Sequence, residues 1–172
     1  MIKILGSVLI IGASTWLGFA IAQDLILRTK QLQELQTAFR LLETEIMYTA
    51  TPLPKALLKI GEKVNSPIAD LFLKCEVILK NELGITADQA WNRAVEKIIP
   101  KTALTYDDKK ILTSFGKNLG NSSREYQEKN LKFIQEQLKL AEKNSVTIKE
   151  DRVKIWRYFG VLGGGLIVIL LY

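Results

Sequence analysis

The most informative stretch of the chain runs from Arg124 to Tyr172, REYQEKNLKFIQEQLKLAEKNSVTIKEDRVKIWRYFGVLGGGLIVILLY. It predicts one long helix, because it contains no proline and no glycine before Gly160. Its first part repeats mostly apolar residues at spacings of three and four, as a helix does where one face packs against another helix. The repeating positions are Leu131, Ile134, Leu138, Ala141, Ser145, Ile148, Arg152 and Ile155. We therefore expect a packing seam along this helix.

The end of the same stretch has the composition of a membrane segment. Residues 158–172 carry no charge, and Arg152, Lys154 and Arg157 precede them together with Trp156. Basic and aromatic residues at the edge of an apolar run are typical of a membrane interface. The run is short, because it covers about 22 Å of helix against a hydrocarbon core of about 30 Å. A full span is the preferred interpretation; a half-inserted tail, a tail buried in a partner and a buried core helix are the alternatives.

Residues 4–22, ILGSVLIIGASTWLGFAIA, form a second uncharged run, which is long enough to cross a bilayer. In both runs small residues recur every four positions, which allows another helix backbone to approach closely. These residues are Ser14, Gly18 and Ala22 in the first run and Gly160 and Gly164 in the second. We expect them to mediate helix packing in the membrane, with partners that the sequence does not identify.

The end of the first run, Ala20-Ile21-Ala22, also resembles a signal-peptidase site. An uncleaved anchor is favoured, because the apolar run exceeds an ordinary signal-peptide core and the helical pattern continues past Gln23. Basic residues follow the first run and precede the second, so the positive-inside rule predicts a cytoplasmic middle. We therefore expect an N-terminal transmembrane anchor at 1–23, a cytoplasmic helical bundle at 24–155 and a C-terminal transmembrane segment at 156–172.

The middle of the chain predicts amphipathic helices and no strand. The first helix continues from the N-terminal run, with a seam at Leu25, Leu32, Leu35, Phe39, Leu42, Ile46 and Thr49. Prolines at 52 and 54 end it. Later helices are expected to begin at Pro54, at Pro67, at Thr86 with Gln89, at Thr105 with Asp108, and after the turn at residues 120–123. The fold class is therefore all-α, a bundle of about six helices whose first and last helices form an antiparallel pair and continue into transmembrane helices.

Composition argues against several kinds of activity. The chain has 172 residues, with 24 Lys and Arg against 18 Asp and Glu in alternation, which fits a solvated surface near anionic lipid and not nucleic acid. There is no histidine, and we find no metal-ligand cluster, phosphate loop or nucleophile with a base. We expect no enzymatic activity, no cofactor and no metal. Cys75 lies in an apolar stripe and is expected to be a buried thiol.

Two carboxylates near the end of the first helix, Glu43 and Glu45, stand out. Residues two apart do not share a helix face, so the pair is expected to flank the seam on opposite sides. Three interpretations are open, in order of preference: structural ion pairs beside the seam, a docking surface for a basic partner, and acid/base catalysis.

Four groups of residues resemble the stage III sporulation protein AB family. They are 41–46 (LLETEI); 51–54 (TPLP) with Ala56 and Leu57; 119–122 (LGNS) with Gln127 and Lys129; and 156–162 (WRYFGVL). The resemblance runs over essentially the whole chain. At one position the chain departs from the expected pattern, since Ser123 stands where an acidic residue is expected.

This resemblance implies a component of the complex that links mother cell and forespore in endospore-forming bacteria. The soluble part is also similar to the cytoplasmic domain of type II secretion F platform proteins, through residues 52–57. It implies a non-enzymatic platform anchored in the outer forespore membrane, with its soluble domain in the mother-cell cytoplasm. The expected partners are the secretion-type ATPase of the complex, its other membrane components and the lipid bilayer.

The ATPase is expected to dock at the turn formed by Glu43, Glu45, Thr51, Pro52, Leu53, Pro54 and Lys55. The alternative is a membrane-tethered helical sensor or regulatory adaptor, whose stalk would transmit a signal. Such a protein would need a linked output domain, and the sequence shows none.

Overall fold

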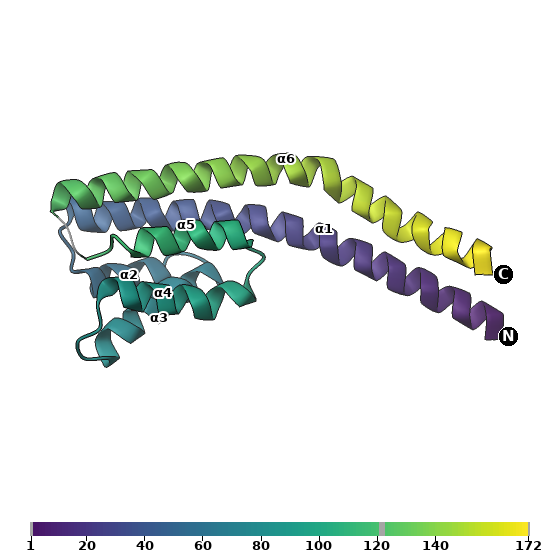
Figure 1. Cartoon of the computed structure of the whole chain (residues 1–172), viewed down its shortest axis with the longest axis horizontal. Helices are drawn as coiled ribbons and strands as arrows, with labels where there is room; N and C mark the ends of the chain where they lie inside the picture. Colours follow the sequence, from purple (N-terminus) through teal and green to yellow (C-terminus); the bar gives the residue numbers. More distant parts are fainter. Residues whose placement is uncertain (1, 121–122, 172) are drawn as a thin grey trace. The chain divides into compact units, whose positions relative to one another are not determined.

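The computed structural model of the chain describes residues 2–120 and 123–171, without the side chains of residues 2–5, 7, 8, 10, 11, 124, 154, 157, 159–161 and 163–171. The described chain contains six α-helices and no strand (Figure 1). They are α1 (Ile2–Glu43), α2 (Leu53–Gly61), α3 (Ile68–Asn81), α4 (Ala87–Ile98), α5 (Tyr106–Gly116) and α6 (Arg124–Leu171). A π-helical turn at Thr44–Tyr48 follows α1, and a 3₁₀ turn at Ile99–Lys101 follows α4. The all-α prediction is confirmed.

The chain divides into two compact units, each of which contains part of α1 and part of α6. Unit 1 comprises Met1–Thr29 and Asn144–Tyr172, and unit 2 comprises Lys30–Lys143. In unit 1 the two helices are joined by the buried hydroxyl groups of Thr29 and Ser145, whose oxygens lie 2.8 Å apart. In unit 2 the same helices run antiparallel, since Glu142 accepts from Gln33 and Glu43 accepts from Gln135.

Among the residues that the structure describes, no helix is both long and apolar enough to cross a membrane. The predicted spans at 4–22 and 158–172 include many residues whose side chains are not described, so both remain predictions. Gly18 and Ala22 are buried in unit 1, and Ser14 is half-buried. For the predicted packing residues Gly160 and Gly164 the structure describes only the backbone, so their packing role remains a prediction.

The core of unit 2 is built around four aromatic rings from four helices. Phe39 of α1, Phe72 of α3, Trp91 of α4 and Phe115 of α5 are buried and meet edge to face, with ring centroids 4.9 to 5.9 Å apart. The indole Nε1 of Trp91 donates a hydrogen bond of 2.8 Å to the carbonyl oxygen of Leu112. This bond satisfies the polar group of a buried tryptophan and fastens α4 to α5.

The two predicted seams are buried through the middle of unit 2, up to Leu42 in α1, and the next seam position, Ile46, is half-buried. The buried positions are Leu32, Leu35, Phe39 and Leu42 in α1 and Leu131, Ile134, Leu138 and Ala141 in α6, and Ser145 is buried at the edge of unit 1.

The outer positions of both seams were predicted wrongly, because Thr49, Arg152 and Ile155 are exposed. Thr49 follows the π-helical turn, where its N–H bonds to the carbonyl of Thr44 at 3.2 Å. Bonding from i to i+5 changes the rotation per residue, so helical spacing no longer predicts the face. Arg152 and Ile155 lie in unit 1, whose described part consists of two helices, and two helices cover only a narrow face of each other.

The predicted helix starts are confirmed where a side chain caps the backbone. Thr86 and Gln89 form a capping box at α4, and Thr105 and Asp108 form another at α5. Cys75 is buried, as expected. Its burial, and to a smaller extent the negative charge of Glu76, raise the pKa of its thiol to about 12. It therefore stays protonated near neutral pH and packs as a small apolar side chain.

The aromatic core makes Trp91 a sensitive position. We expect Trp91→Phe to lower the free energy of unfolding by about 1 to 3 kcal/mol, since it removes the bond to Leu112 and leaves part of the ring's volume empty. Guanidinium unfolding followed by circular dichroism measures this. Trp16→Phe is the matched control, because Trp16 is 74% exposed, and it should change stability by less than about 0.5 kcal/mol. Equal effects of the two substitutions would contradict a central role for Trp91.

Candidate functional site

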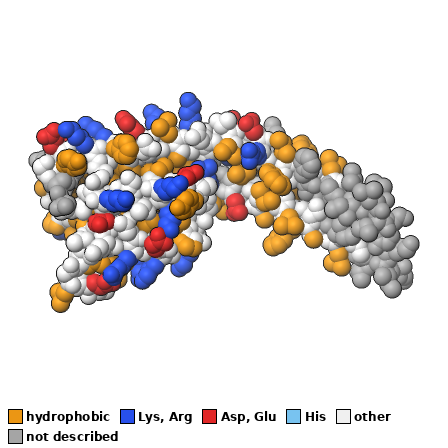
Figure 2. All heavy atoms as spheres, viewed as in Figure 1, with side chains coloured by type: hydrophobic (Ala, Val, Ile, Leu, Met, Phe, Trp, Pro, Cys, Tyr) orange, Lys and Arg blue, Asp and Glu red, His pale blue; other side chains and the backbone are white. Residues whose placement is uncertain are grey.

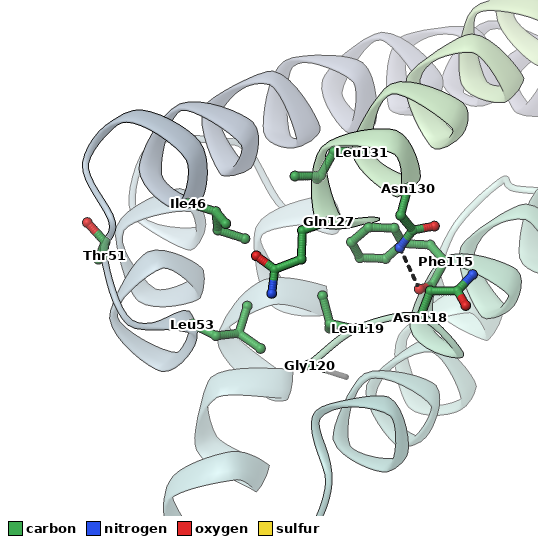
Figure 3. A pocket seen from close by; sticks show the side chains of 10 residues that line it. All are labelled: Ile46, Thr51, Leu53, Phe115, Asn118, Leu119, Gly120, Gln127, Asn130 and Leu131. Carbon is green, nitrogen blue, oxygen red and sulfur yellow. Dashed lines mark hydrogen bonds between the residues drawn. The ribbon is translucent and has the colours of Figure 1, made fainter. Parts of the chain in front are cut away.

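A cavity of about 130 Å³ lies in unit 2 where the turn after α1 meets the start of α6 (Figure 3). We call it the turn cavity. Three of the four groups of residues that carry the family resemblance contribute to its wall. The lining residues are Ile46, Thr51, Leu53, Phe115, Asn118, Leu119, Gly120, Gln127, Asn130 and Leu131. Segments far apart in the sequence therefore converge on one small site.

An irregular turn shapes one side of this cavity. After the π-helical turn, the N–H of Thr51 donates to the carbonyl of Glu45 at 2.9 Å. Ala50 adopts a φ of +51°, a left-handed conformation that costs about 1 to 2 kcal/mol in a residue with a Cβ atom. Pro52 then precedes the first residue of α2. The backbone thus reverses direction within a few residues and places Thr51 and Leu53 against the cavity.

Glu45 fastens this turn to α2. Its Oε2 accepts from the Thr51 hydroxyl at 2.7 Å and from the Lys59 ammonium at 2.6 Å, and its side chain is only 13% exposed. The hydrogen bonds from Lys59 and then Thr51 hold the pKa of Glu45 below its ordinary value. A carboxylate with two donors and little exposed surface has a structural role here.

Glu43 faces a different element. Its Oε2 accepts from Nε2 of Gln135 in α6 at 2.8 Å. The two carboxylates therefore bond to α6 and α2 respectively, as their spacing of two residues predicts. Glu45 forms an ion pair with Lys59, as the structural interpretation expects, whereas the hydrogen-bond partner of Glu43 is a neutral amide; docking of a partner through either carboxylate remains a prediction.

The exposed part of the turn is made by other side chains. Tyr48 is 83% exposed, and Pro52 and Lys55 are exposed beside it, while Leu53 and Pro54 are half-buried. Sequence reasoning missed Tyr48, although an aromatic residue just before a turn is a recognisable signal, since tyrosine is enriched among the residues that dominate binding energy at interfaces.

The opposite wall, from α6, was also missed as part of the site. Figure 3 shows the Gln127 side chain pointing into the cavity, while the amide of Asn130 donates to the carbonyl of Phe115 at 3.3 Å. Among the described residues, no hydrogen bond ties the side-chain amide of Gln127 to another protein group, while its backbone N–H donates to the carbonyl of Ser123 at 3.1 Å. The cavity is thus lined by apolar side chains together with the side-chain amides of Gln127, Asn118 and Asn130, of which that of Asn130 is held by Phe115.

The arrangement is suited to binding. The described residues hold no group of three or more His, Cys, Asp or Glu side chains that could ligate a metal. The polar groups at the turn cavity are a threonine hydroxyl and side-chain amides, and the nearest carboxylates are bonded internally. A partner's side chain could enter the cavity while its backbone contacts Tyr48, Pro52 and Lys55.

The role of Glu45 predicts a pH dependence. Because the pKa of Glu45 is lower in the folded chain than its ordinary value of 4.5, ionised Glu45 contributes to the free energy of unfolding above that pH, and this contribution is lost as the pH falls through the lowered pKa. We expect Glu45→Gln to be less stable than the wild type near pH 7 and to lose less stability on acidification. Guanidinium unfolding between pH 3 and pH 7 measures both effects. Glu62→Gln, at an exposed carboxylate, is the control. Parallel pH curves for wild type and Glu45→Gln would contradict this role.

Comparison with known proteins gives one consistent result. A family model described as Stage III sporulation protein AB matches residues 3–172. The chain is 32% identical over 171 residues to the stage III sporulation protein AB of Bacillus subtilis (strain 168), and the alignment covers 99% of each protein. A solved structure of stage III sporulation protein AB (SpoIIIAB) is similar with a TM-score of 0.69 and 28% identity, over 73% of this chain and 98% of that chain.

Proposed function

Because the chain belongs to the stage III sporulation protein AB family, we propose that it is a non-enzymatic platform in the sporulation complex between mother cell and forespore. In this proposal unit 1 anchors the protein in the outer forespore membrane, unit 2 faces the mother-cell cytoplasm with a fold like that of type II secretion F proteins, and the turn cavity docks the secretion-type ATPase of the complex.

The exposed surface of unit 1 supports an anchor. Figure 2 shows hydrophobic side chains gathered over the described part of this unit. Large apolar side chains exposed together are favourable only beside lipid or another apolar surface. The most exposed are Leu9 at 67%, Trp16 at 74%, Leu17 at 58%, Tyr158 at 66% and Leu162 at 69%.

The single observation that supports docking at the turn cavity is the convergence described above. Three groups that carry the family resemblance each contribute to the cavity wall: 41–46 through Ile46, 51–54 through Thr51 and Leu53, and 119–122 with Gln127 through Leu119, Gly120 and Gln127. Tyr48, Pro52 and Lys55 are exposed residues of the same turn segment as the lining residues Thr51 and Leu53, and they make no contribution to the core. A surface of this kind, with a small pocket and an exposed tyrosine at its edge, matches the usual anatomy of a protein interface.

The test is a binding titration between the full chain in lipid nanodiscs and the purified ATPase of the same complex. We expect Tyr48→Ala to weaken binding by about 30-fold, which corresponds to about 2 kcal/mol at an interface centre. The effect of Lys55→Glu on affinity reports the charge of the ATPase surface, and it should grow as the salt concentration falls. The substitution should weaken binding to an acidic surface and strengthen binding to a basic one.

Two matched substitutions serve as controls for this titration. Leu83→Ala removes a fully exposed apolar side chain between α3 and α4, and Lys97→Glu reverses an exposed charge on α4. Neither should change the affinity. Unchanged affinity in Tyr48→Ala would exclude the turn as the docking surface, and no binding by the unmodified chain would contradict the platform itself.

A further inference from the structure

The outward face of α6 in unit 2 carries large apolar side chains that the fold does not use. Tyr126, Phe133 and Leu140 follow one another at intervals of seven residues and are 59%, 55% and 57% exposed. Seven residues are close to two helical turns, so the three side chains lie in one line along the helix. We call this line the outer stripe. Figure 2 shows hydrophobic side chains among basic and acidic ones along the edge where Figure 1 places α6.

A hollow of about 210 Å³ lies beside the outer stripe, between α5 and α6. Phe115 and Ile134, both buried, form part of its lining, with Ile111 and Phe133 around them. A cavity of about 150 Å³ holds a benzene molecule, so this hollow has room for one leucine or phenylalanine side chain. The amides of Asn130 and Gln137 line it as well. An inserted apolar side chain would therefore meet a mostly apolar wall with a polar rim.

A basic groove lies on the other side of the outer stripe, between α1 and α6. It has a volume of about 330 Å³ and is lined by Gln36, Arg40, Lys132, Gln135, Glu136 and Lys139. Three of these side chains are cationic and one is anionic.

The groove contains one carboxylate of its own, Glu136, and the two carboxylates that bond to its lining glutamines are held by those bonds. Glu142 accepts from Gln33 at 2.7 Å and from Gln36 at 2.6 Å, and those bonds lower the pKa of Glu142. Glu43 is bonded to Gln135. Lys132 pairs with Glu128 at 2.6 Å, a surface ion pair of the kind that contributes little energy and rearranges readily. The groove therefore offers Arg40, Lys132 and Lys139 to an anionic group.

From these three features we infer that α6 docks an amphipathic helix of a partner protein. The partner's apolar face covers Tyr126, Phe133 and Leu140 and inserts one large side chain into the α5–α6 hollow. Its acidic flank lies over the basic groove, opposite Arg40 and Lys139. An apolar helix face in an apolar groove with charges at the border is a common recognition mode. The three cations of the groove favour a partner whose carboxylates lie on the flank that faces the groove, whereas the one cation that lines the α5–α6 hollow, Lys110, is paired with Asp107 at 3.1 Å.

The inference goes beyond the proposed docking of the ATPase at the turn cavity. The outer stripe and the basic groove use neither Tyr48 nor Lys55, so Tyr48→Ala and Lys55→Glu should leave this second interaction unchanged. Failure of either interaction can therefore be recognised separately.

The experiment is site-specific photo-cross-linking in sporulating cells that express the full chain. A benzoylphenylalanine replaces Phe133, which it resembles in shape, and a second chain carries the same group at Leu83 as a control. After irradiation, mass spectrometry identifies the cross-linked peptide. We expect a cross-link at position 133 to a helical segment that repeats apolar residues every three or four positions and carries Asp or Glu along one flank, and no such product at position 83.

Charge reversal sharpens this test. Lys139→Glu in the cross-linking chain should lower the yield of the cross-link at position 133 about tenfold, because the new carboxylate would lie opposite the acidic flank of the partner helix. The exposed Lys97→Glu is the control and should leave the yield unchanged. A cross-link to a second copy of this chain, to lipid or to a basic segment would overturn the inference, as would the absence of any product or an unchanged yield in Lys139→Glu.

Discussion

The packing of four aromatic rings is the interaction on which the rest of unit 2 depends. Phe39, Phe72, Trp91 and Phe115 come from four helices, and edge-to-face pairs of this kind are worth about 0.5 to 1.5 kcal/mol each beyond the area they bury. The bond from Trp91 to Leu112 fixes the position of α5. Phe115 of α5 lines both the turn cavity and the α5–α6 hollow. The core therefore determines the shape of both proposed surfaces.

Local rules predicted much of this fold from the sequence. The capping residues Thr86 and Thr105 bond to backbone groups three residues away, so their role depends on a short stretch of chain. The seams were predicted correctly where several helices surround them. They failed at Thr49, Arg152 and Ile155, because the π-helical turn and the number of neighbouring helices are consequences of tertiary structure.

The candidate site shows the same division. Spacing predicted that Glu43 and Glu45 point to different sides, and the prolines marked the turn. The sequence could not show that Lys59 and Thr51 bond to Glu45, since Lys59 lies in the next helix. Nor could it show that Gln127 and Leu53 line the same cavity, or that Tyr48 remains exposed. The exposure of a side chain depends on which distant segments of the chain pack against it, and the local sequence around a residue does not specify those segments.

The features of unit 2 favour binding over chemistry. Its carboxylates near the turn are bonded internally, its thiol is buried, and its hollows are lined by apolar side chains, amides, basic side chains and one carboxylate, Glu136. A platform needs surfaces that hold partners in fixed positions, and a rigid aromatic core provides them. In the proposed arrangement, unit 1 would hold these surfaces at a membrane.

The most direct test of this account is the topology of the full chain in cells. A reporter that is active only outside the cytoplasm would be inserted at the exposed turn near Ser66, and a second reporter would be fused to the C-terminus. The account predicts a silent reporter at Ser66 and an active one at the C-terminus. An active reporter at Ser66 would contradict it, because unit 2 and an ATPase that uses cytoplasmic nucleotide would then lie on opposite sides of the membrane.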